Sequence, residues 1–233
     1  MSESEAVDRD GDPDVLIRLI LLRHGEVASH RGDVPITDSG WKQARRAGAW
    51  LAQQGLDVVD VLYGGTRRTR ETAEGVAAGL AGNGSVLSTS DSFALRNPDL
   101  YLGGQRVTMV SGAEAFAEQV PALEAKDVLA VPFFATWLTH PERVGFWVGN
   151  SHPPGDTAVS VARRIDAFAR SLADVPAWRG RTVVGVTHSP VLRSIGLVTA
   201  DTDPGEPPYV HGYELVVRQG ASMDVTVISP ATS

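Results

Sequence analysis

Cysteine is absent from the 233 residues of the sequence. Its absence excludes disulfide bonds, thiolate metal sites and cysteine nucleophiles. The sequence also lacks any apolar run that approaches the roughly 20 residues needed to span a bilayer. Residues 1–14 are acidic and polar, unlike the basic start and apolar centre of a signal peptide, and we expect them to form a disordered tail. These features predict a soluble protein of the cytoplasm that has no membrane partner.

An excess of positive charge is also missing. The formal net charge is −7, and the lysines and arginines are scattered along the chain. A basic face for nucleic acid is therefore not expected, although this composition does not exclude a small local basic pocket. Hydrophobic residues make up 42% of the sequence and charged residues 21%, which suits one globular domain with a substantial core, over residues 15–233.

Aliphatic segments alternate with helical patterns along most of the chain. Residues 16–22 form a nearly continuous aliphatic run that ends abruptly at Arg23, which is typical of a buried parallel strand. Further strands are predicted at 58–63, 85–89, 182–187, 213–217 and 225–228, a turn at 82–84, and helices at about 39–55, 67–80, 157–173 and 191–198. Thr37 or Ser39 is expected to cap the first helix, and Asp156 or Thr157 the third. The predicted fold class is α/β: a three-layer α/β/α sandwich with a mostly parallel central sheet.

The pattern becomes irregular between about residues 95 and 155, with one helical stretch near 113–124. We interpret residues 96–152 as a cap inserted into the domain. This segment carries an aromatic cluster of Phe133, Phe134, Trp137, Phe146 and Trp147. The cluster has two interpretations: a small hydrophobic core for the insertion, which we favour, or a wall of a substrate pocket.

Two histidines lie immediately after predicted buried strands, His24 after residues 16–23 and His188 after 182–187. Either histidine alone is more simply a polar strand end. If both strands are central and parallel, however, the two imidazoles meet at the sheet edge where active sites of open α/β sheets lie. Together with the nearby arginines, the pair therefore indicates a functional site.

The segment Arg23-His24-Gly25-Glu26, directly after an aliphatic strand, resembles the signature of the histidine phosphatase superfamily, also called phosphoglycerate-mutase-like. Further segments resemble that family in the family's own order and together cover most of residues 16–200, although the stretch 100–150 is not covered. They are the stretch 36–44 (Ile-Thr-Asp-Ser-Gly-Trp-Lys-Gln-Ala), the stretch 64–74 with arginines before Thr72-Ala73-Glu74, the loop 153–157, and Thr187-His188-Ser189.

The resemblance implies that His24 attacks the phosphorus of a phosphomonoester and forms a phosphohistidine, which water then hydrolyses. Arg23 and Arg68 are then expected to neutralise the equatorial phosphoryl oxygens, because a guanidinium donates paired hydrogen bonds and stays charged. His188 adds a donor, and Ser189 and Asn97 are expected to contact substrate. The ordinary imidazole pKa of about 6.5 leaves His24 available as a neutral nucleophile near pH 7. No metal or other cofactor is expected, because the arginines neutralise the charge.

The chain departs from the family at the proton donor for the leaving group. The family usually places a glutamate in a Leu-x-Glu segment, but here the stretch is Leu95-Arg96-Asn97. An asparagine has no proton to give at a usable pKa. We expect Asp99 to replace it, provided that burial or a second carboxylate raises its pKa; the alternative is an ordinary loop aspartate. Glu26, equally interpretable as a structural partner of an arginine or histidine, and Glu142 are the further candidates.

These features predict a phosphomonoesterase that acts on a small-molecule phosphate ester. One alternative is a phosphoglycerate-type phosphomutase, which is disfavoured because the family's mutases use the acid that is missing here. The other is a protein that binds phosphate without turnover, which is disfavoured because Arg23, His24, Arg68 and His188 together are more than a phosphate-binding module needs. An aromatic cap suits a substrate larger than a glycolytic acid and hinders a protein substrate. The sequence permits a homodimer without requiring one.

Overall fold

The computed structural model describes residues 12–29, 32–81 and 87–230. Most of the predicted tail and the predicted turn at 82–84 lie outside these residues. Among the described residues, no helix is both long and apolar enough to cross a bilayer.

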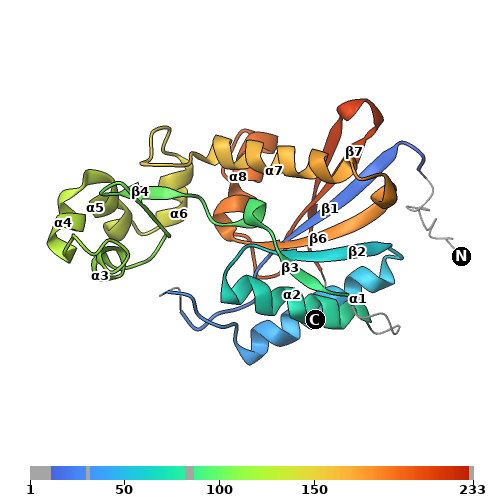
Figure 1. The fold of residues 1–233 in the computed structure, drawn as a ribbon, viewed down its shortest axis with the longest axis horizontal. Helices are drawn as coiled ribbons and strands as arrows, with labels where there is room; N and C mark the ends of the chain where they lie inside the picture. The colour runs from blue at the N-terminus through green and yellow to red at the C-terminus, as the bar shows by residue number, and fades with distance from the viewer. Residues whose placement is uncertain (1–11, 30–31, 82–86, 231–233) are drawn as a thin grey trace, which may run out of the picture.

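The core of the fold is a six-stranded sheet in the order β3-β2-β6-β1-β7-β8 (Figure 1). β1 pairs in parallel with β6, which pairs in parallel with β2, and β2 pairs in parallel with β3; β7 and β8 are antiparallel additions. The predicted mostly parallel α/β sheet is thus confirmed. The strands are β1 (Val15–Arg23), β2 (Val58–Tyr63), β3 (Thr89–Asp91), β6 (Arg181–Thr187), β7 (Gly212–Arg218) and β8 (Met223–Ile228).

Helices cover both faces of the sheet, and β1 contributes to both layers because successive side chains of a strand point to opposite faces. Ile17, Leu19 and Leu21 pack in the same cluster as residues of α7 (Ala158–Ala173) and α8 (Ser189–Ala200). Ile20 and Leu22 pack with residues of α1 (Asp38–Gln53) and α2 (Arg67–Leu80). An aliphatic run without alternation is therefore what a strand buried on two sides requires.

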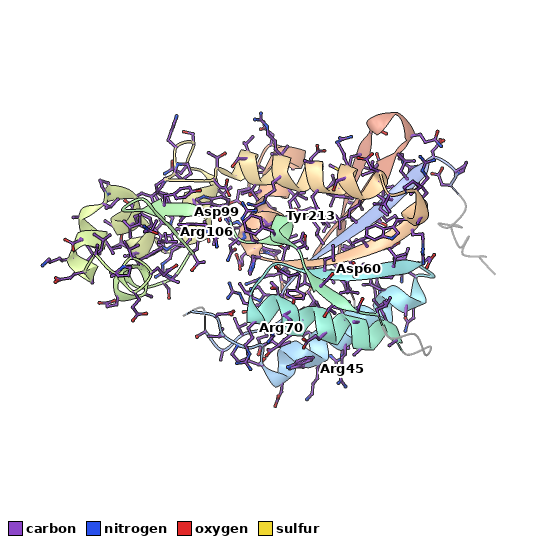
Figure 2. All side chains as sticks on the ribbon, in the orientation of Figure 1. Arg45, Asp60, Arg70, Asp99, Arg106 and Tyr213 are labelled. Carbon is purple, nitrogen blue, oxygen red and sulfur yellow. The ribbon has the colours of Figure 1, made fainter. Side chains whose placement is uncertain are left out.

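α1 and α2 pack backbone to backbone on one face of the sheet. A Cβ atom on Gly48 would lie 2.1 Å from the carbonyl oxygen of Val76, and one on Gly79 would lie 2.1 Å from that of Arg45. The exposed side chain of Arg45 labelled in Figure 2 extends from the outer side of this layer. Thr37 caps α1 as predicted, since its side chain accepts a hydrogen bond from the Gly40 amide.

The elements between residues 100 and 148 form a lobe at one end of the sheet (Figure 1), inside the segment 96–152 interpreted above as a cap, and we call this lobe the cap. The prediction of one helix near 113–124 is wrong: α3 ends at Ala117, and α4 begins only at Ala125. Pro121 explains the break, because proline has no amide hydrogen and disfavours helical geometry in the residue before it. The cap elements are β4 (Leu100–Leu102), β5 (Gln105–Val107), α3 (Ala113–Ala117), α4 (Ala125–Ala130), α5 (Pro132–Thr139) and α6 (Arg143–Val148).

Most of the aromatic cluster forms the core of the cap. The ring centroids of Phe116 and Phe134 lie 4.8 Å apart, and those of Phe133 and Phe146 lie 5.4 Å apart. Trp147 is fully buried and donates its indole N–H to the carbonyl of Asp156. The favoured interpretation, a small core for the insertion, is confirmed for these residues.

Candidate active site

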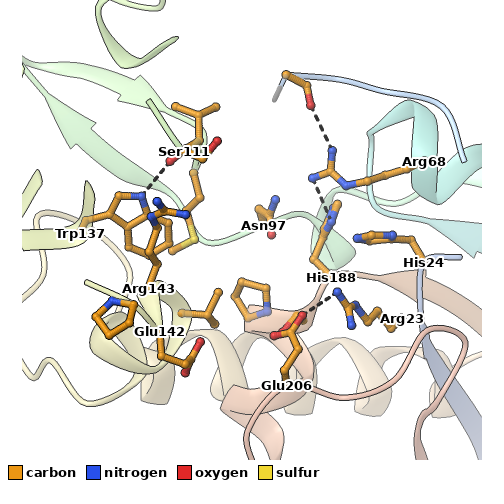
Figure 3. Close-up of a pocket in the computed structure, with 17 residues that line it drawn as sticks. Arg23, His24, Arg68, Asn97, Ser111, Trp137, Glu142, Arg143, His188 and Glu206 are labelled. Carbon is orange, nitrogen blue, oxygen red and sulfur yellow. Dashed lines mark hydrogen bonds and ion pairs between the residues drawn. The ribbon is translucent and has the colours of Figure 1, made fainter. Parts of the chain in front are cut away.

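His24 and His188 follow the neighbouring parallel strands β1 and β6 at the same level of the sheet. Arg23 is the register partner of Thr187, and the His24 amide donates to the Thr187 carbonyl over 3.0 Å. The two imidazole centroids lie 5.8 Å apart with their planes at 65°. The predicted meeting of the two histidines at one sheet edge is therefore confirmed (Figure 3).

Local contacts select the tautomer of His24. Its Nδ1 lies 2.8 Å from the carbonyl oxygen of Gly25, and a carbonyl can only accept. Nδ1 therefore carries the hydrogen, and the lone pair is on Nε2. Gly25 is held in turn, since its amide donates to Thr72 of α2 and a Cβ here would lie 2.9 Å from the Gly40 carbonyl oxygen. Imidazole orientation thus depends on both α1 and α2.

Arg23 and Arg68 bring two guanidinium groups to the histidines. Burial lowers the pKa of each from its ordinary value, although both stay protonated at neutral pH. The Nε atom of each is buried and has no hydrogen-bond partner among the described residues. Arg23 donates to the carbonyl of Pro207 over 2.5 Å, and Arg68 lies 3.4 Å from Nδ1 of His188. Two desolvated cations with unmatched N–H groups favour an anion between them.

His188 is neutral at pH 7. Burial is the largest cause that holds its pKa well below the ordinary value, and the positive charge of Arg68 acts in the same direction. Its Nε2 lies 3.5 Å from the carbonyl of Gly64, which can only accept, while Nδ1 faces the Arg68 guanidinium. The neutral Nε2–H tautomer satisfies both contacts.

A cavity of about 290 Å³ connects these groups to the cap. Its far wall includes the apolar residues Met109, Val110, Val144 and Trp137, together with the polar Ser111 and Arg143. The indole N–H of Trp137 donates to the Val110 carbonyl over 2.8 Å, so its polar atom is satisfied and its ring is available to the cavity. Of the predicted aromatic cluster, only Trp137 lines this cavity within the described part of the chain.

Asn97 and Ser189, the further residues predicted to contact substrate, also line the cavity. The Asn97 Oδ1 atom is buried without a hydrogen-bond partner among the described residues. Ser189 begins α8 directly after His188, and its hydroxyl donates to Glu206 over 2.5 Å. Both side chains are placed to meet a ligand, and their binding roles stay predictions.

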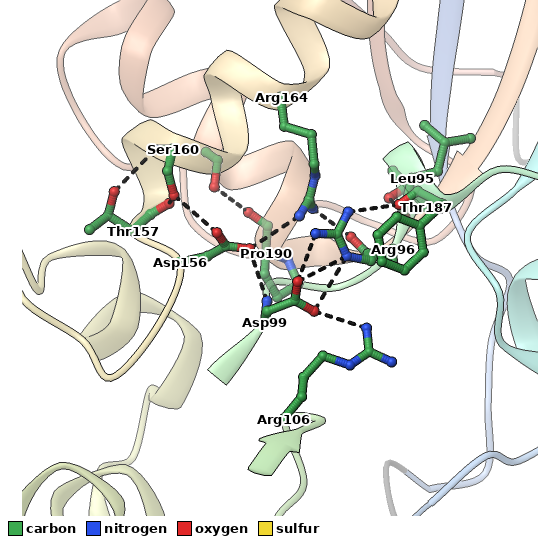
Figure 4. Close-up of polar contacts among 12 residues, drawn as sticks. Leu95, Arg96, Asp99, Arg106, Asp156, Thr157, Ser160, Arg164, Thr187 and Pro190 are labelled. Atoms are coloured by element: carbon green, nitrogen blue, oxygen red, sulfur yellow. Dashed lines mark hydrogen bonds and ion pairs between the residues drawn. The ribbon is translucent and has the colours of Figure 1, made fainter. Parts of the chain in front are cut away.

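Asp99 is a structural residue rather than the expected acid. Its carboxylate accepts hydrogen bonds from Arg96, the shortest 2.7 Å, and from Arg106 at 3.0 Å (Figures 2 and 4). Burial acts to raise its pKa, but the two arginines outweigh burial and hold the pKa below its ordinary value. A general acid needs the opposite shift. Asp99 is also not among the described residues that line the His24 cavity.

Glu26 has a structural role, but the partner that the structure shows for its carboxylate is Thr37 and not the expected arginine or histidine. Its carboxylate accepts from the Thr37 hydroxyl over 2.9 Å, and its backbone carbonyl accepts from the Thr37 amide. It thereby connects the loop after β1 to the start of α1. Glu26 is not among the described residues that line the cavity, so the structure argues against a direct catalytic role.

Glu206, which the sequence did not single out, also lines the cavity. It lies in the loop between α8 and β7, where one carboxylate oxygen is 2.6 Å from Arg23 and the other accepts from Ser189. No local pattern marks it, because its partners precede it by many residues. Glu142 lines the cavity too, but Arg193 donates to both of its oxygens.

Comparisons with known proteins agree with this geometry. The family model described as histidine phosphatase superfamily (branch 1) matches residues 19–91. A 2,3-bisphosphoglycerate-dependent phosphoglycerate mutase of Rhizobium etli is 27% identical over 184 residues, which cover 76% of this chain and 77% of that protein.

Solved structures share the fold. A mycobacterial glucosyl-3-phosphoglycerate phosphatase, Rv2419c, superimposes with a TM-score of 0.61 at 18% identity, covering 92% of this chain and 99% of that one. A putative alpha-ribazole-5'-P phosphatase of Escherichia coli gives 0.54 at 17% identity, with 92% and 97% covered. The two converging histidines and the paired arginines agree with the family match, which identifies a histidine phosphatase superfamily domain over residues 19–91 of this chain.

Proposed function

We propose that this protein is a phosphomonoesterase that hydrolyses a small-molecule phosphate ester through a phosphohistidine on His24. One observation carries the proposal: a histidine whose lone pair is on Nε2 lines a cavity with two guanidinium groups whose Nε–H groups are buried and unmatched. The arrangement offers a nucleophile and a charge-neutralising cradle in the same place.

In the first step, Nε2 of His24 attacks the phosphorus and the ester oxygen leaves. A dianionic phosphoryl group repels a nucleophile until its equatorial oxygens are neutralised, and Arg23 and Arg68 are positioned to do this. Because both guanidinium groups are held in place before substrate arrives, little reorganisation is needed. Loss of one such preorganised donor typically costs about 3–4 kcal/mol of transition-state stabilisation.

In the second step, water attacks the phosphohistidine and releases phosphate and His24. His188, neutral and buried, accepts from the Arg68 guanidinium with Nδ1 and so holds this cation at the cradle without adding a permanent charge. The negative charge of a bound phosphoryl group acts on the pKa of His188 in the direction opposite to the Arg68 charge.

The mixed far wall, apolar except for Ser111, Glu142 and Arg143, supports a substrate whose phosphate is attached to a bulky, partly apolar group. Met109, Val110 and Trp137 form this wall at the cap end of the cavity. Two of the solved structures that share the fold are named as phosphatases of larger phosphate esters, glucosyl-3-phosphoglycerate and alpha-ribazole-5'-P. We therefore favour hydrolysis of such an ester over a reaction of a simple glycolytic acid.

Mutase activity is the second candidate, because a phosphoglycerate mutase is the sequence relative described above. The asparagine at position 97 argues against it, since the mutases of the family use a glutamate at the matching position. Incubation with phosphoglycerates separates the two reactions. Isomerisation faster than phosphate release would favour the mutase.

The central test is hydrolysis of p-nitrophenyl phosphate by the wild type and by His24→Ala. We expect turnover in the wild type, its loss in the variant, and an acid-labile phosphoryl group trapped on His24. His152→Ala serves as the matched control, because His152 is an exposed loop histidine hydrogen-bonded to Ser151. Phosphate binding without any turnover by the wild type would instead support a non-catalytic binding protein. A panel of metabolite phosphates then identifies the substrate class.

A further inference from the structure

We propose that Glu206 donates the proton to the leaving group and later accepts one from the attacking water. This inference rests on the proposed phosphatase function. The leaving alkoxide requires a proton, and neither Asn97 nor the ion-paired Asp99 can provide it. Two carboxylates line the cavity among the described residues, Glu142 and Glu206.

Glu142 is unsuited to the role. Arg193, whose side chain is only 1% exposed, donates to both of its oxygens at 2.6 and 3.0 Å, and the Gly145 amide donates to one of them. Hydrogen bonds from Arg193 are the main cause that lowers the pKa of Glu142. A carboxylate with these partners binds a proton poorly, and Glu142 instead connects α6 of the cap to α8.

Glu206 is in a different electrostatic position (Figure 3). Arg23, whose charge the substrate phosphoryl group also needs, lies 2.6 Å from one of its oxygens. Arg193 lies 3.7 Å from the other oxygen, farther than its contacts of 2.6 and 3.0 Å with Glu142. Ser189, adjacent to His188 in the chain, donates to the other carboxylate oxygen and orients it toward the cavity. The side chain is 46% exposed, so it can exchange protons with solvent.

In the proposed reaction the ester replaces Glu206 as the partner of Arg23. A phosphoryl dianion at Arg23 takes over the guanidinium donors and puts negative charge beside the Glu206 carboxyl group. The proton for the leaving oxygen is then carried by this carboxyl group in the complex with the ester.

The proton balance closes over the two steps. As the bond from phosphorus to His24 forms and the ester P–O bond breaks, protonated Glu206 gives its proton to the leaving oxygen and an alcohol departs. Water then attacks the phosphohistidine, the P–N bond breaks, and the Glu206 carboxylate accepts the proton of that water. Phosphate and neutral His24 are released, and the carboxyl group is again protonated until phosphate leaves.

The test compares Glu206→Gln with the wild type on an alkyl phosphate and on p-nitrophenyl phosphate. For the alkyl ester, whose leaving oxygen needs a proton, we expect kcat to fall on the order of 10²–10⁴-fold. For p-nitrophenyl phosphate, we expect the pre-steady-state burst of p-nitrophenolate to keep its rate while the steady state slows. Phosphohistidine then accumulates, and Glu206→Asp recovers part of both activities.

Glu74→Gln is the matched control. Glu74 is 45% exposed and lies 3.7 Å from Arg70, so the variant removes a similar charge from a similar arginine on the outer side of α2, and both activities should be unchanged. If Glu206 only positions Arg23, its variants lose the same factor on both esters, with a raised KM and no accumulation of phosphohistidine. That result overturns the inference while leaving the proposed function intact. A wild type without burst or phosphohistidine refutes the proposed function itself.

Discussion

Replacing Asp99 with asparagine should lower the stability of the protein and leave the chemistry nearly unchanged. The Asp99 carboxylate, whose side chain is 15% exposed, is the partner of the 19% exposed Arg96 at 2.7 Å. Arg106 adds a second, more exposed contact. Around this group, Arg164 donates to Asp156 and to the Arg96 carbonyl, so the cluster connects the entry and exit of the cap (Figure 4).

The magnitude follows from burial. The Arg106 contact is mostly exposed and contributes little, whereas a hydrogen bond between charged groups that are largely buried contributes about 1.5–3 kcal/mol. In Asp99→Asn, an amide NH₂ group also replaces one of the two carboxylate oxygens. This group donates and cannot accept the hydrogen bond of the Arg96 guanidinium, which has only donors. We therefore expect a loss of about 2 kcal/mol in the free energy of unfolding, which corresponds to a Tm lower by roughly 4–8 °C for a chain of this size.

Thermal and urea unfolding of wild type and Asp99→Asn measure this loss. Asp166→Asn is a matched control, because Asp166 also accepts several hydrogen bonds from one arginine, Arg170, but is 40% exposed. Its Tm should change much less. Because the pKa of Asp99 is lowered on folding, its stabilisation is present above the unfolded pKa of about 3.9 and is lost as pH falls through the lower folded value. The difference between wild type and Asp99→Asn should thus shrink below about pH 4.

The turnover of Asp99→Asn decides between a structural and a catalytic role. At a temperature where both proteins are folded, kcat on an alkyl phosphate and on p-nitrophenyl phosphate should change by similar, small factors. An unchanged Tm with a selective loss on the alkyl ester would show that Asp99 is the proton donor after all, and the reasoning from its ion pairs would be wrong.

Three further predictions concern α2 and His188. Gly79→Ala should lower the free energy of unfolding by about 1–3 kcal/mol, because the added Cβ would lie 2.1 Å from the Arg45 carbonyl oxygen. Gly112→Ala is the control, since its added Cβ would meet no atom closer than 3.6 Å and should leave the free energy of unfolding unchanged. Equal urea midpoints for the two variants would contradict this packing. Arg68→Lys should reduce kcat/KM for phosphate esters by at least about 10-fold with unchanged Tm, since an ammonium group cannot reproduce the guanidinium fork. The lowered pKa of His188 means that the unfolded chain binds a proton there first, so stability should fall as pH drops below about 6.5. Urea midpoints measured from pH 7.5 to 5.5 should show a smaller decrease in His188→Gln, and parallel curves would refute the assignment.

Short-range patterns in the sequence predicted the central strands and the meeting of the two histidines, although they placed the edge strand at 85–89 and not at Thr89–Asp91. The aliphatic run at residues 16–22 shows no alternation, and only a strand covered on both faces needs such a run. His24 and His188 follow such strands, and the carboxyl ends of parallel strands lie along one edge, so the meeting of the two imidazoles was predictable.

Tertiary structure alone decided the charge partners. Whether Asp99 is an acid or an ion-pair residue depends on the direction of the Arg96 and Arg106 side chains, which no periodicity encodes. Glu206 reaches Arg23 because the loop before β7 folds back on the end of β1, and the adjacent contact from Arg23 to Pro207 joins residues 184 positions apart. Backbone periodicity depends on near neighbours in the chain, whereas the pKa of a carboxylate depends on charges a few ångströms away in space, and these are brought together only by folding.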